Sequence, residues 1–393
     1  MASKRRAGAA VILIAALSVG AAACGSSGGG GSSSGLPSTI TIGSPLDLSG
    51  VAAAANVGVS ELKGEQLAVS QINSSGFLGK SKINLDSSDT QTVTTTAVQS
   101  VIGMTQGGNK VDGIVGFTLS ASFFAAGPYA QKAHVPVITV DLSDTGITQV
   151  GDYIFRVAPA EDDVYMATDP QILKALGAKT AAYIYDSDSA NVVAQSTFRR
   201  DLAQSLGVKT VADESVTSDA ISFQAQLTKI KAAHPDVLIQ DLNGGQDPTF
   251  LAQAAQAGLK IPIMADIGFD VPSIFTTPEA NCATFSTIWN AAANTGKNQA
   301  FQAAYKSKDG AAPDVYAAEG YDAIYLMATA FKDANSVDGP KVQAALAAIK
   351  GGFSGALGVY GFDSQRSPTI TPITFEIDKG TAVLWKPGIS CTP

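Results

Sequence analysis

The sequence predicts an α/β fold built from mostly parallel sheets and divided into two lobes. Short β-branched runs alternate with helical patterns from Thr39 onward, which is typical of parallel strands joined by crossover helices. The same alternation restarts after residues 155–159. Without the first 23 residues the chain keeps 370, enough for two domains of roughly 100 to 200 residues each.

The first block of elements begins with a β-branched run at residues 39–42, followed by a Gly-, Ser- and Pro-containing loop. An apolar stripe that includes Leu67 and Ile72 predicts a helix over residues 59–73, which ends before Gly76. The rest of the block is predicted as a strand at 82–86, a helix at 92–104, a strand at 113–116, a helix at 124–133 and a strand at 135–140.

The second block shows the same alternation of strands and helices. We expect a strand at 180–186, helices at 192–206 and 223–233, a strand at 237–240, a helix at 249–257 and a strand at 261–265. Helices at 301–305, 315–334 and 342–349 and strands at 373–377 and 382–385 complete the chain. Trp289, Trp385 and the helical stripe of Tyr321, Ile324, Tyr325 and Ala328 are interpreted as core.

The N-terminus predicts export and a lipid anchor. Three basic residues precede an apolar run of 17 residues at 7–23, shorter than the roughly 20 that a membrane-spanning helix needs. Small residues directly before Cys24 suit a lipoprotein signal peptidase, so residues 1–23 are predicted as a lipoprotein signal peptide and Cys24 as the lipidation site. The alternative is an ordinary secretory signal that leaves a free thiol. Residues 24–37 are predicted to be a flexible Gly/Ser tether.

The composition describes a packed and acidic body. Hydrophobic residues make up 45% of the chain and charged residues 15%, unlike a disordered protein. Without the leader the chain has 23 Lys and Arg against 34 Asp and Glu, a net charge of −11. Such a body repels phosphate backbones, and basic residues do not cluster with aromatics, which argues against nucleic-acid binding.

Two cysteines lie beyond Cys24, namely Cys282 and Cys391. Disulfides persist outside the cytoplasm, so we predict one bridge that holds the C-terminal tail, the alternative being two buried free thiols.

Ligands of open α/β sheets bind at the carboxyl ends of the strands. The corresponding loops are rich in Ser, Thr, Asn, Asp and Gly, which offer hydroxyls, carboxylates and free backbone amides. These loops are expected at residues 45–56, 117–122, 141–145, 186–191, 241–247 and 266–270.

Short segments in a particular order indicate a family. They are IGSPL at 42–46 with LSG at 48–50, Gly64 to Gly76 with Ile72-Asn73, DGIVG at 112–116, VPVI at 135–138, FRVAP at 155–159, FQAQL at 223–227 and YAAEGYDAIY at 316–325. In this order the chain resembles the type I periplasmic binding proteins of ABC transporters, of the branched-chain-amino-acid-binding type.

The resemblance implies two Rossmann-like lobes with parallel sheets, joined by three crossovers, which close over a small ligand like a hinged trap. Lobe 1 is expected at residues 38–155 plus 290–357, and lobe 2 at residues 156–289 plus 358–393. A ligand that contacts both lobes stabilises the closed state over the open one.

The resemblance also implies ligand-binding positions. Those that hold the ligand carboxylate fall at Thr118, Ser120, Leu142 and Ser143. The acid that clamps the ammonium falls at Ile267, and two aromatic positions fall at Ala190 and Asn243, so these anchors are replaced here.

Two residues near the lost anchors are candidates for the site. Asp266 replaces the acid through a register shift, or the ligand is not an α-amino acid and Asp266 is a helix cap or a solvated loop acid. Tyr316 borders the ligand side chain or packs in the core.

The sequence does not match the catalytic and metal-binding motifs that parts of it resemble. Gly-Lys-Ser at 79–81 lacks the glycine spacing of a phosphate loop, and residues 186–197 lack the glycine and glutamate of a calcium loop. His134 and His234 lie between a helix and a Pro-led strand, without the partners of a zinc site or a triad. We therefore expect no enzyme activity, no cofactor and no metal.

The sequence thus predicts an extracytoplasmic, lipid-anchored receptor, on a cell surface or in a periplasm, that delivers a small ligand to an ABC transporter permease. The ligand is expected to be an amino acid or a related amide or organic acid. The alternative is a ligand-sensing receptor domain coupled to a membrane signalling partner.

The lipid anchor predicts that Cys24→Ser shifts the protein from the membrane fraction to the supernatant, because the thiol that carries the acyl chains is lost. Fractionation followed by immunoblotting measures this. Unchanged membrane association of the variant would contradict the anchor.

Overall fold

The computed structural model describes residues 35–387 except 109, 243–244 and 294–295. The leader, Cys24, Asn243 and Cys391 lie outside the described residues. The predicted signal peptide, lipidation and disulfide therefore stay predictions.

A five-stranded sheet organises the N-terminal part of the chain. Its strands are β1 (Thr39–Leu46), β2 (Lys82–Asp89), β3 (Gly113–Gly116), β4 (Val137–Thr139) and β5 (Ile154–Arg156). They are all parallel, in the order β2-β1-β3-β4-β5. All their carboxyl ends therefore meet at one edge.

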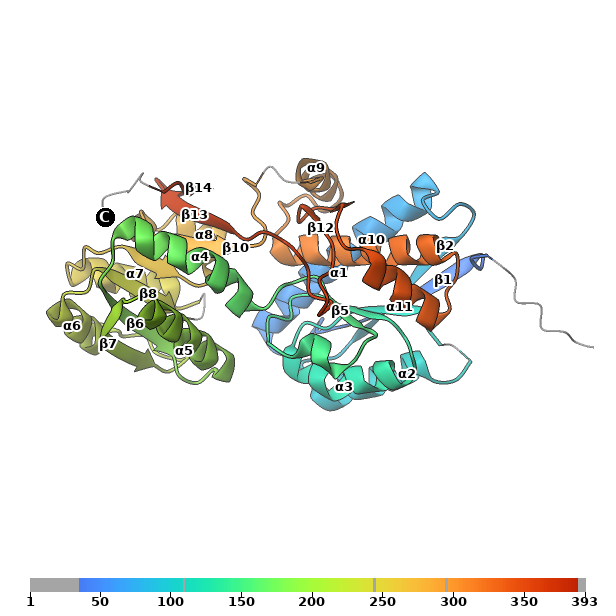
Figure 1. The fold of residues 1–393 in the computed structure, drawn as a ribbon, viewed down its shortest axis with the longest axis horizontal. Coiled ribbons are helices and arrows are strands. Elements are labelled where there is room, and N and C mark those ends of the chain that lie inside the picture. Colours follow the sequence, from blue (N-terminus) through green and yellow to red (C-terminus); the bar gives the residue numbers. More distant parts are fainter. Residues whose placement is uncertain (1–34, 109, 243–244, 294–295, 388–393) are drawn as a thin grey trace, which may run out of the picture. The chain divides into compact units, whose positions relative to one another are not determined.

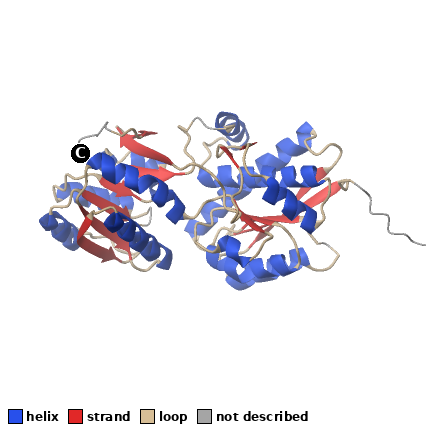
Figure 2. Cartoon of the chain, in the orientation of Figure 1, coloured by secondary structure: helices blue, strands red, loops and turns tan. Residues whose placement is uncertain are grey.

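Helices cover both faces of this sheet (Figures 1 and 2). α1 (Ala52–Ser75) and α10 (Val315–Ala334) pack together on one face, and α2 (Thr94–Thr105) and α3 (Ser120–Lys132) cover the other. α9 (Asn298–Asp309) packs beside α1 and α11 (Gly339–Ala348) beside α10, next to the short hairpin of β11 (Phe353–Ser354) and β12 (Val359–Tyr360). A 3-10 turn, η1 (Ile147–Val150), precedes β5.

A seven-stranded sheet organises the second part. It contains β6 (Thr180–Asp186), β7 (Lys209–Val216), β8 (Val237–Asp241), β9 (Ile263–Ala265), β10 (Thr284–Thr287), β13 (Ile373–Asp378) and β14 (Thr381–Leu384). The order is β14-β13-β10-β9-β8-β6-β7. β13 pairs antiparallel with both of its neighbours, β10 and β14, and the other neighbouring pairs are parallel.

The second sheet is also covered on both faces. α4 (Glu161–Leu176) and α5 (Ala190–Ser205) bury one face, and α6 (Gln224–Ala233) and α7 (Asp247–Gln256) bury the other. Shorter turns are η2 (Ile267–Phe269), α8 (Pro272–Phe275) and η3 (Pro278–Ala280).

These elements confirm the predicted α/β fold with two mostly parallel sheets. In the described part, the chain passes between the sheets at residues 156–161, 287–298 and 360–373. The predicted core residues Trp289, Tyr321, Ile324 and Ala328 are buried.

Several elements were missing from the sequence prediction, among them β5, β7, α4 and β10. β7 is an edge strand whose side chains alternate between exposed and half-buried and include Asp213 and Glu214, so its composition does not favour a strand. α4 contains Pro170, which does not favour a helix interior. β5 lies where the sequence was interpreted as a crossover. β10 is only four residues long.

A close helix crossing joins α1 to α10. A Cβ atom added to Gly64 would lie 2.0 Å from the carbonyl oxygen of Ala317, and one added to Gly320 would lie 2.4 Å from that of Glu61. The two helix backbones therefore touch at both glycines. The crossing also brings the buried side chains of Glu61 and Glu319 close to each other.

We predict that Gly320→Ala destabilises the protein by about 1 to 3 kcal/mol, because the added methyl group forces the packed helices apart. Urea unfolding measures the change. Gly103→Ala is the matched control, since Gly103 lies in α2 with nothing within 4 Å of the added atom. An unchanged midpoint for Gly320→Ala would contradict the close crossing.

Candidate ligand-binding site

A cleft of about 500 Å³ lies where the loops after the strands of both sheets meet. Loops after β3 and β4 supply one side, and loops after β6, β8 and β9 supply the other. A smaller hollow of about 60 Å³ shares Asp141, Ser143, Glu161, Ile267, Gly268 and Tyr316 with it. The site therefore lies at the carboxyl ends of the strands, where the topology predicts it.

The structure brings five of the predicted site residues together in this cleft: Thr118, Ser120, Ser143, Asp266 and Tyr316. Leu142 is instead buried in the core under α2 and α3, and its carbonyl accepts a hydrogen bond from Arg156. Ala190 is exposed at the start of α5, and its neighbours Ser189 and Asn191 line the cleft in its place. Asn243 lies outside the described residues.

Two of the three hydroxyls are already bonded to protein carboxylates. Thr118 Oγ1 donates to Glu61 Oε2 at 2.8 Å and accepts from the Asp47 amide at 3.2 Å. The Ser143 side chain bonds the carboxylate of Glu161. A hydroxyl has one proton to donate, so neither is available to a ligand carboxylate while these acids are ionised.

The start of α3 offers a better carboxylate site than those two hydroxyls. Ser120 is the first residue of the helix, and Ser120 and Ala121 both line the cleft. The first amides of a helix have no partner within it and carry the positive end of the helix dipole. A carboxylate would bind there without any Lys or Arg.

Asp266 is the N-cap residue of η2 and is buried. It is 5% exposed, makes no side-chain capping bond to η2, and its Oδ1 has no hydrogen-bond partner. Burial, together with the carboxylates of Asp247 and Asp241, raises the pKa of Asp266 well above its ordinary value. The contact of Asp266 with a ligand stays a prediction.

Sequence reasoning missed the other acids of the site. Glu161 begins α4, and burial raises its pKa to about 7. Glu319, within α10, accepts from the Asp141 amide at 2.7 Å, and burial raises its pKa to about 8. Burial and the nearby Glu319 raise the pKa of Asp141 well above its ordinary value. Asp141 falls in the loop predicted at residues 141–145, whereas Glu161 and Glu319 lie within helices, where a strand-end rule does not search.

Arg156 is a buried cation beside these acids, but its guanidinium donates its hydrogen bonds to backbone carbonyls. Its guanidinium donates to the carbonyls of Leu142, Ala158 and Asp144, the last at 2.8 Å. Burial lowers its pKa to about 10. The residue thus shapes the loop after β4, and it does not line the cleft.

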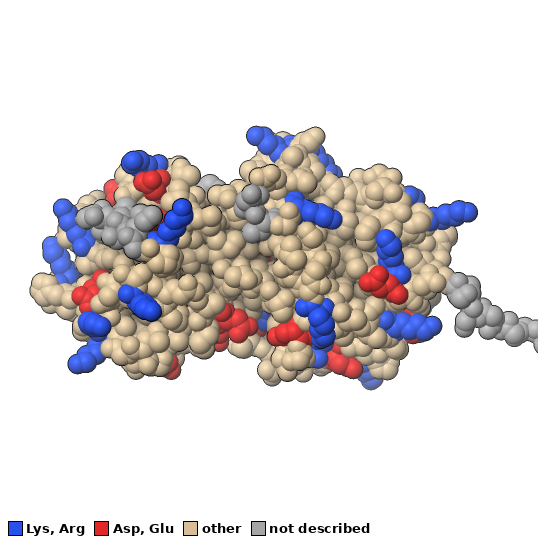
Figure 3. Space-filling view, turned by 45° about the horizontal axis from the view of Figure 1, so that its top comes forward, with Lys and Arg blue, Asp and Glu red and all other residues tan. Residues whose placement is uncertain are grey.

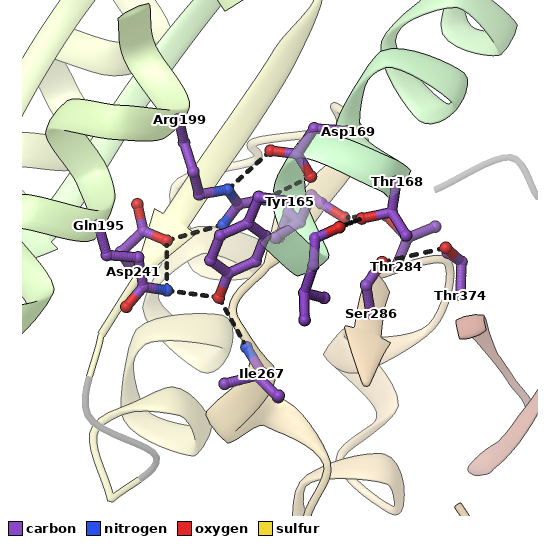
Figure 4. A network of polar contacts seen from close by, with 12 residues as sticks. Tyr165, Thr168, Asp169, Gln195, Arg199, Asp241, Ile267, Thr284, Ser286 and Thr374 are labelled. Carbon is purple, nitrogen blue, oxygen red and sulfur yellow. Dashed lines mark hydrogen bonds and ion pairs between the residues drawn. The ribbon is translucent and has the colours of Figure 1, made fainter. Parts of the chain in front are cut away.

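A second buried network supports the loop that carries Asp266 (Figure 4). Arg199 lies between Asp169 and Asp241, at 2.9 Å and 2.7 Å, with its guanidinium 4.3 Å from the ring centroid of Tyr165. The Tyr165 hydroxyl accepts from the Ile267 amide at 3.1 Å. The network therefore fixes the backbone next to Asp266, and Arg199 is occupied by other acids.

The charges on the outer surface differ from those in the cleft. On the face shown in Figure 3, described Lys and Arg side chains are spread out and do not gather into one patch.

Within the described residues, no group of His, Cys, Asp and Glu is arranged to hold a metal ion. In the same residues, no helix has the length and apolarity to cross a membrane.

Comparison with known proteins gives the family. The model of the periplasmic binding protein family matches residues 39–380. The chain belongs to the periplasmic binding protein family. This membership places the binding protein outside the cytoplasm.

Individual relatives agree with the family. An amino acid binding protein of Pseudomonas aeruginosa is 26% identical over 294 residues, which are 73% of this chain and 77% of the relative. The leucine-binding protein LivK of Thermotoga maritima superposes with a TM-score of 0.75 at 24% identity, covering 88% of this chain and 98% of that one.

LivJ of Streptococcus pneumoniae is a branched-chain amino acid transporter substrate-binding protein that was solved with isoleucine. It superposes with a TM-score of 0.75 at 26% identity, covering 88% of this chain and 97% of LivJ. These proteins are solute-binding proteins and not enzymes. The cleft is accordingly the candidate ligand site of this binding protein.

We predict that the ligand-free binding protein loses stability as the pH rises from about 5 to about 8. Burial raises the pKa values of Glu65, Glu319 and Asp247 to about 8 each. The folded state then holds protons that the unfolded chain releases, so the free energy of unfolding falls with pH. Thermal unfolding at several pH values measures this.

Glu65→Gln provides the comparison, since it removes one raised carboxyl while its amide oxygen can still accept from Ser44, which donates to Glu65 at 2.6 Å. Its melting temperature should fall less between pH 5 and pH 8 than that of the unsubstituted protein. A melting temperature that rises over this interval in the unsubstituted protein would contradict the buried acids.

Proposed function

We propose that this binding protein is a lipid-anchored receptor that captures an amino acid, or a related amide or organic acid, and delivers it to an ABC transporter permease. The observation that supports this most is the cleft, whose walls come from loops of both sheets. A ligand in contact with both walls binds the closed state more strongly and so drives closure.

The ligand contacts follow from the geometry of the cleft. The carboxylate binds the amides at the start of α3 with the Ser120 hydroxyl. The ammonium binds Asp266, which replaces the family acid by one position. Tyr316 lines the cleft and its adjoining hollow and borders the ligand side chain. In this assignment Thr118 and Ser143 orient neighbouring carboxylates.

Transport is favoured over sensing by the relatives. One is named an amino acid binding protein and another a transporter substrate-binding protein. The lobes proposed are residues 38–155 plus 290–357 and residues 156–289 plus 358–393. Cys24 and residues 24–37 would tether them to the membrane near a permease. The proposed Cys282–Cys391 bridge would hold the C-terminal tail beside η3, which Cys282 follows.

Ligand screening tests the proposal. Unfolding is followed with each of a set of amino acids, amides and organic acids present in excess. A true ligand at 100 times its Kd stabilises the folded state by about 2.7 kcal/mol, and X-ray scattering should show compaction with it. A complete set without a stabilising compound would contradict the receptor function.

The Ser120 assignment has its own test. Ser120→Ala should weaken the best carboxylate ligand by about 1 kcal/mol through one lost hydrogen bond. Ser205→Ala is the matched control, because Ser205 lies exposed at the end of α5 and donates to the Leu202 carbonyl. Equal affinity of both variants would remove Ser120 from the site.

A further inference from the structure

The walls of the cleft are unusually one-sided in charge. Asp141, Asp144, Glu161 and Asp266 line the cleft, and Glu319 lines the adjoining hollow. No Lys, Arg or His is among the described residues that line either space. The acids come from both sides, since Asp141 and Asp144 follow β4 and Asp266 follows β9.

Two carboxylate oxygens at this site lack a protein partner. Asp266 Oδ1 is buried without a hydrogen bond, and Glu161 Oε2 is in the same condition. Unpartnered buried acceptors cost about 1 to 3 kcal/mol each, and more when charged. Both residues line the cleft, so a donor placed there would satisfy them.

The protein's own cations do not fill this need. Arg199 donates to Asp169 and Asp241, and Arg156 donates to three backbone carbonyls. A zwitterionic ligand brings one ammonium and also one carboxylate, so it leaves the charge of the cleft unchanged. Among amino acids, only one with a second positive group reduces the excess of acids.

We propose that the ligand is cationic: an amino acid whose side chain ends in an ammonium or guanidinium group. Its carboxylate lies at the start of α3, and its two positive groups lie against the acids around Asp266 and Glu161. Tyr316 lines both spaces and offers a ring face to the chain of methylenes and the cation. This inference rests on the proposed receptor function and names its ligand class.

Matched ligand pairs test the charge directly. Isothermal titration calorimetry at pH 8 and low salt compares lysine with norleucine, and arginine with citrulline. Each pair has a similar shape and differs in one positive charge. We expect the charged member of at least one pair to bind tenfold or more tightly than its neutral partner. Equal or tighter binding of both neutral members overturns the inference.

The outcomes separate this inference from the receptor function. Binding of norleucine or citrulline with compaction, and without a preference for charge, keeps the receptor and removes the cationic ligand. Tighter binding of citrulline than of arginine indicates an amide ligand and also overturns the inference. Failure of all four compounds overturns the cationic ligand, and failure of the wider set as well contradicts the receptor.

Substitution of the unpartnered acid tests its role. Asp266→Asn keeps the shape and should reduce the lysine-to-norleucine ratio at least fivefold. Asp201→Asn is the matched control, because Asp201 is exposed on α5 and its loss changes the net charge equally. Its ratio should stay unchanged. Glu161→Gln is the second variant if Asp266→Asn does not fold. An unchanged ratio in the folded variants overturns the role of these acids.

Discussion

The structure depends on buried carboxylates, within helices as well as at strand ends, that do not have enough neighbouring cations to neutralise them. A buried carboxylate is destabilised unless it is hydrogen-bonded, paired or protonated. Glu61, Glu65 and Glu319 are almost fully buried, and each of the first two keeps one oxygen without a partner. Burial raises the pKa of all three. Of the three, Glu319 lines the hollow beside the cleft, and Glu61 and Glu65 line neither space.

Helix packing brings buried acids together beside the five-stranded sheet. Because Gly64 and Gly320 let α1 and α10 touch, Glu61 and Glu319 are close and the Thr118 hydroxyl is drawn to Glu61. The acids beside the seven-stranded sheet differ in whether a cation pairs with them. Asp169 and Asp241 are paired with Arg199, whereas Asp266, held by the same loop that Tyr165 fixes, has no cation of its own. Asp169 and Asp241 therefore form ion pairs within the protein, whereas Asp266 forms no ion pair in the described residues.

Much of the fold could be predicted from the sequence because it depends on local patterns. The strand at residues 180–186 and the helix at residues 315–334 have the predicted bounds. The edge strand β7 could not be predicted in the same way, since its charged, half-exposed side chains resemble those of a loop. Topology also predicted which loops meet at the cleft.

The chemistry of the cleft could be predicted only in part. Asp266 and Tyr316 were named because the family resemblance places them at or beside its ligand-binding positions, and both line the cleft. Glu161 and Glu319 were not, because their burial depends on how helices pack and not on any spacing in the sequence. The available hydroxyl protons could not be counted either, since the partners of Thr118 and Ser143 are set by tertiary contacts.

The most direct measurement is the proton balance of ligand binding. Calorimetry of lysine binding at pH 7, in two buffers with different ionisation enthalpies, gives the number of protons exchanged. A cation beside carboxyl groups of raised pKa favours their ionised form, so our account predicts a net release of protons. Binding heats that do not depend on the buffer, or an uptake of protons, would contradict it.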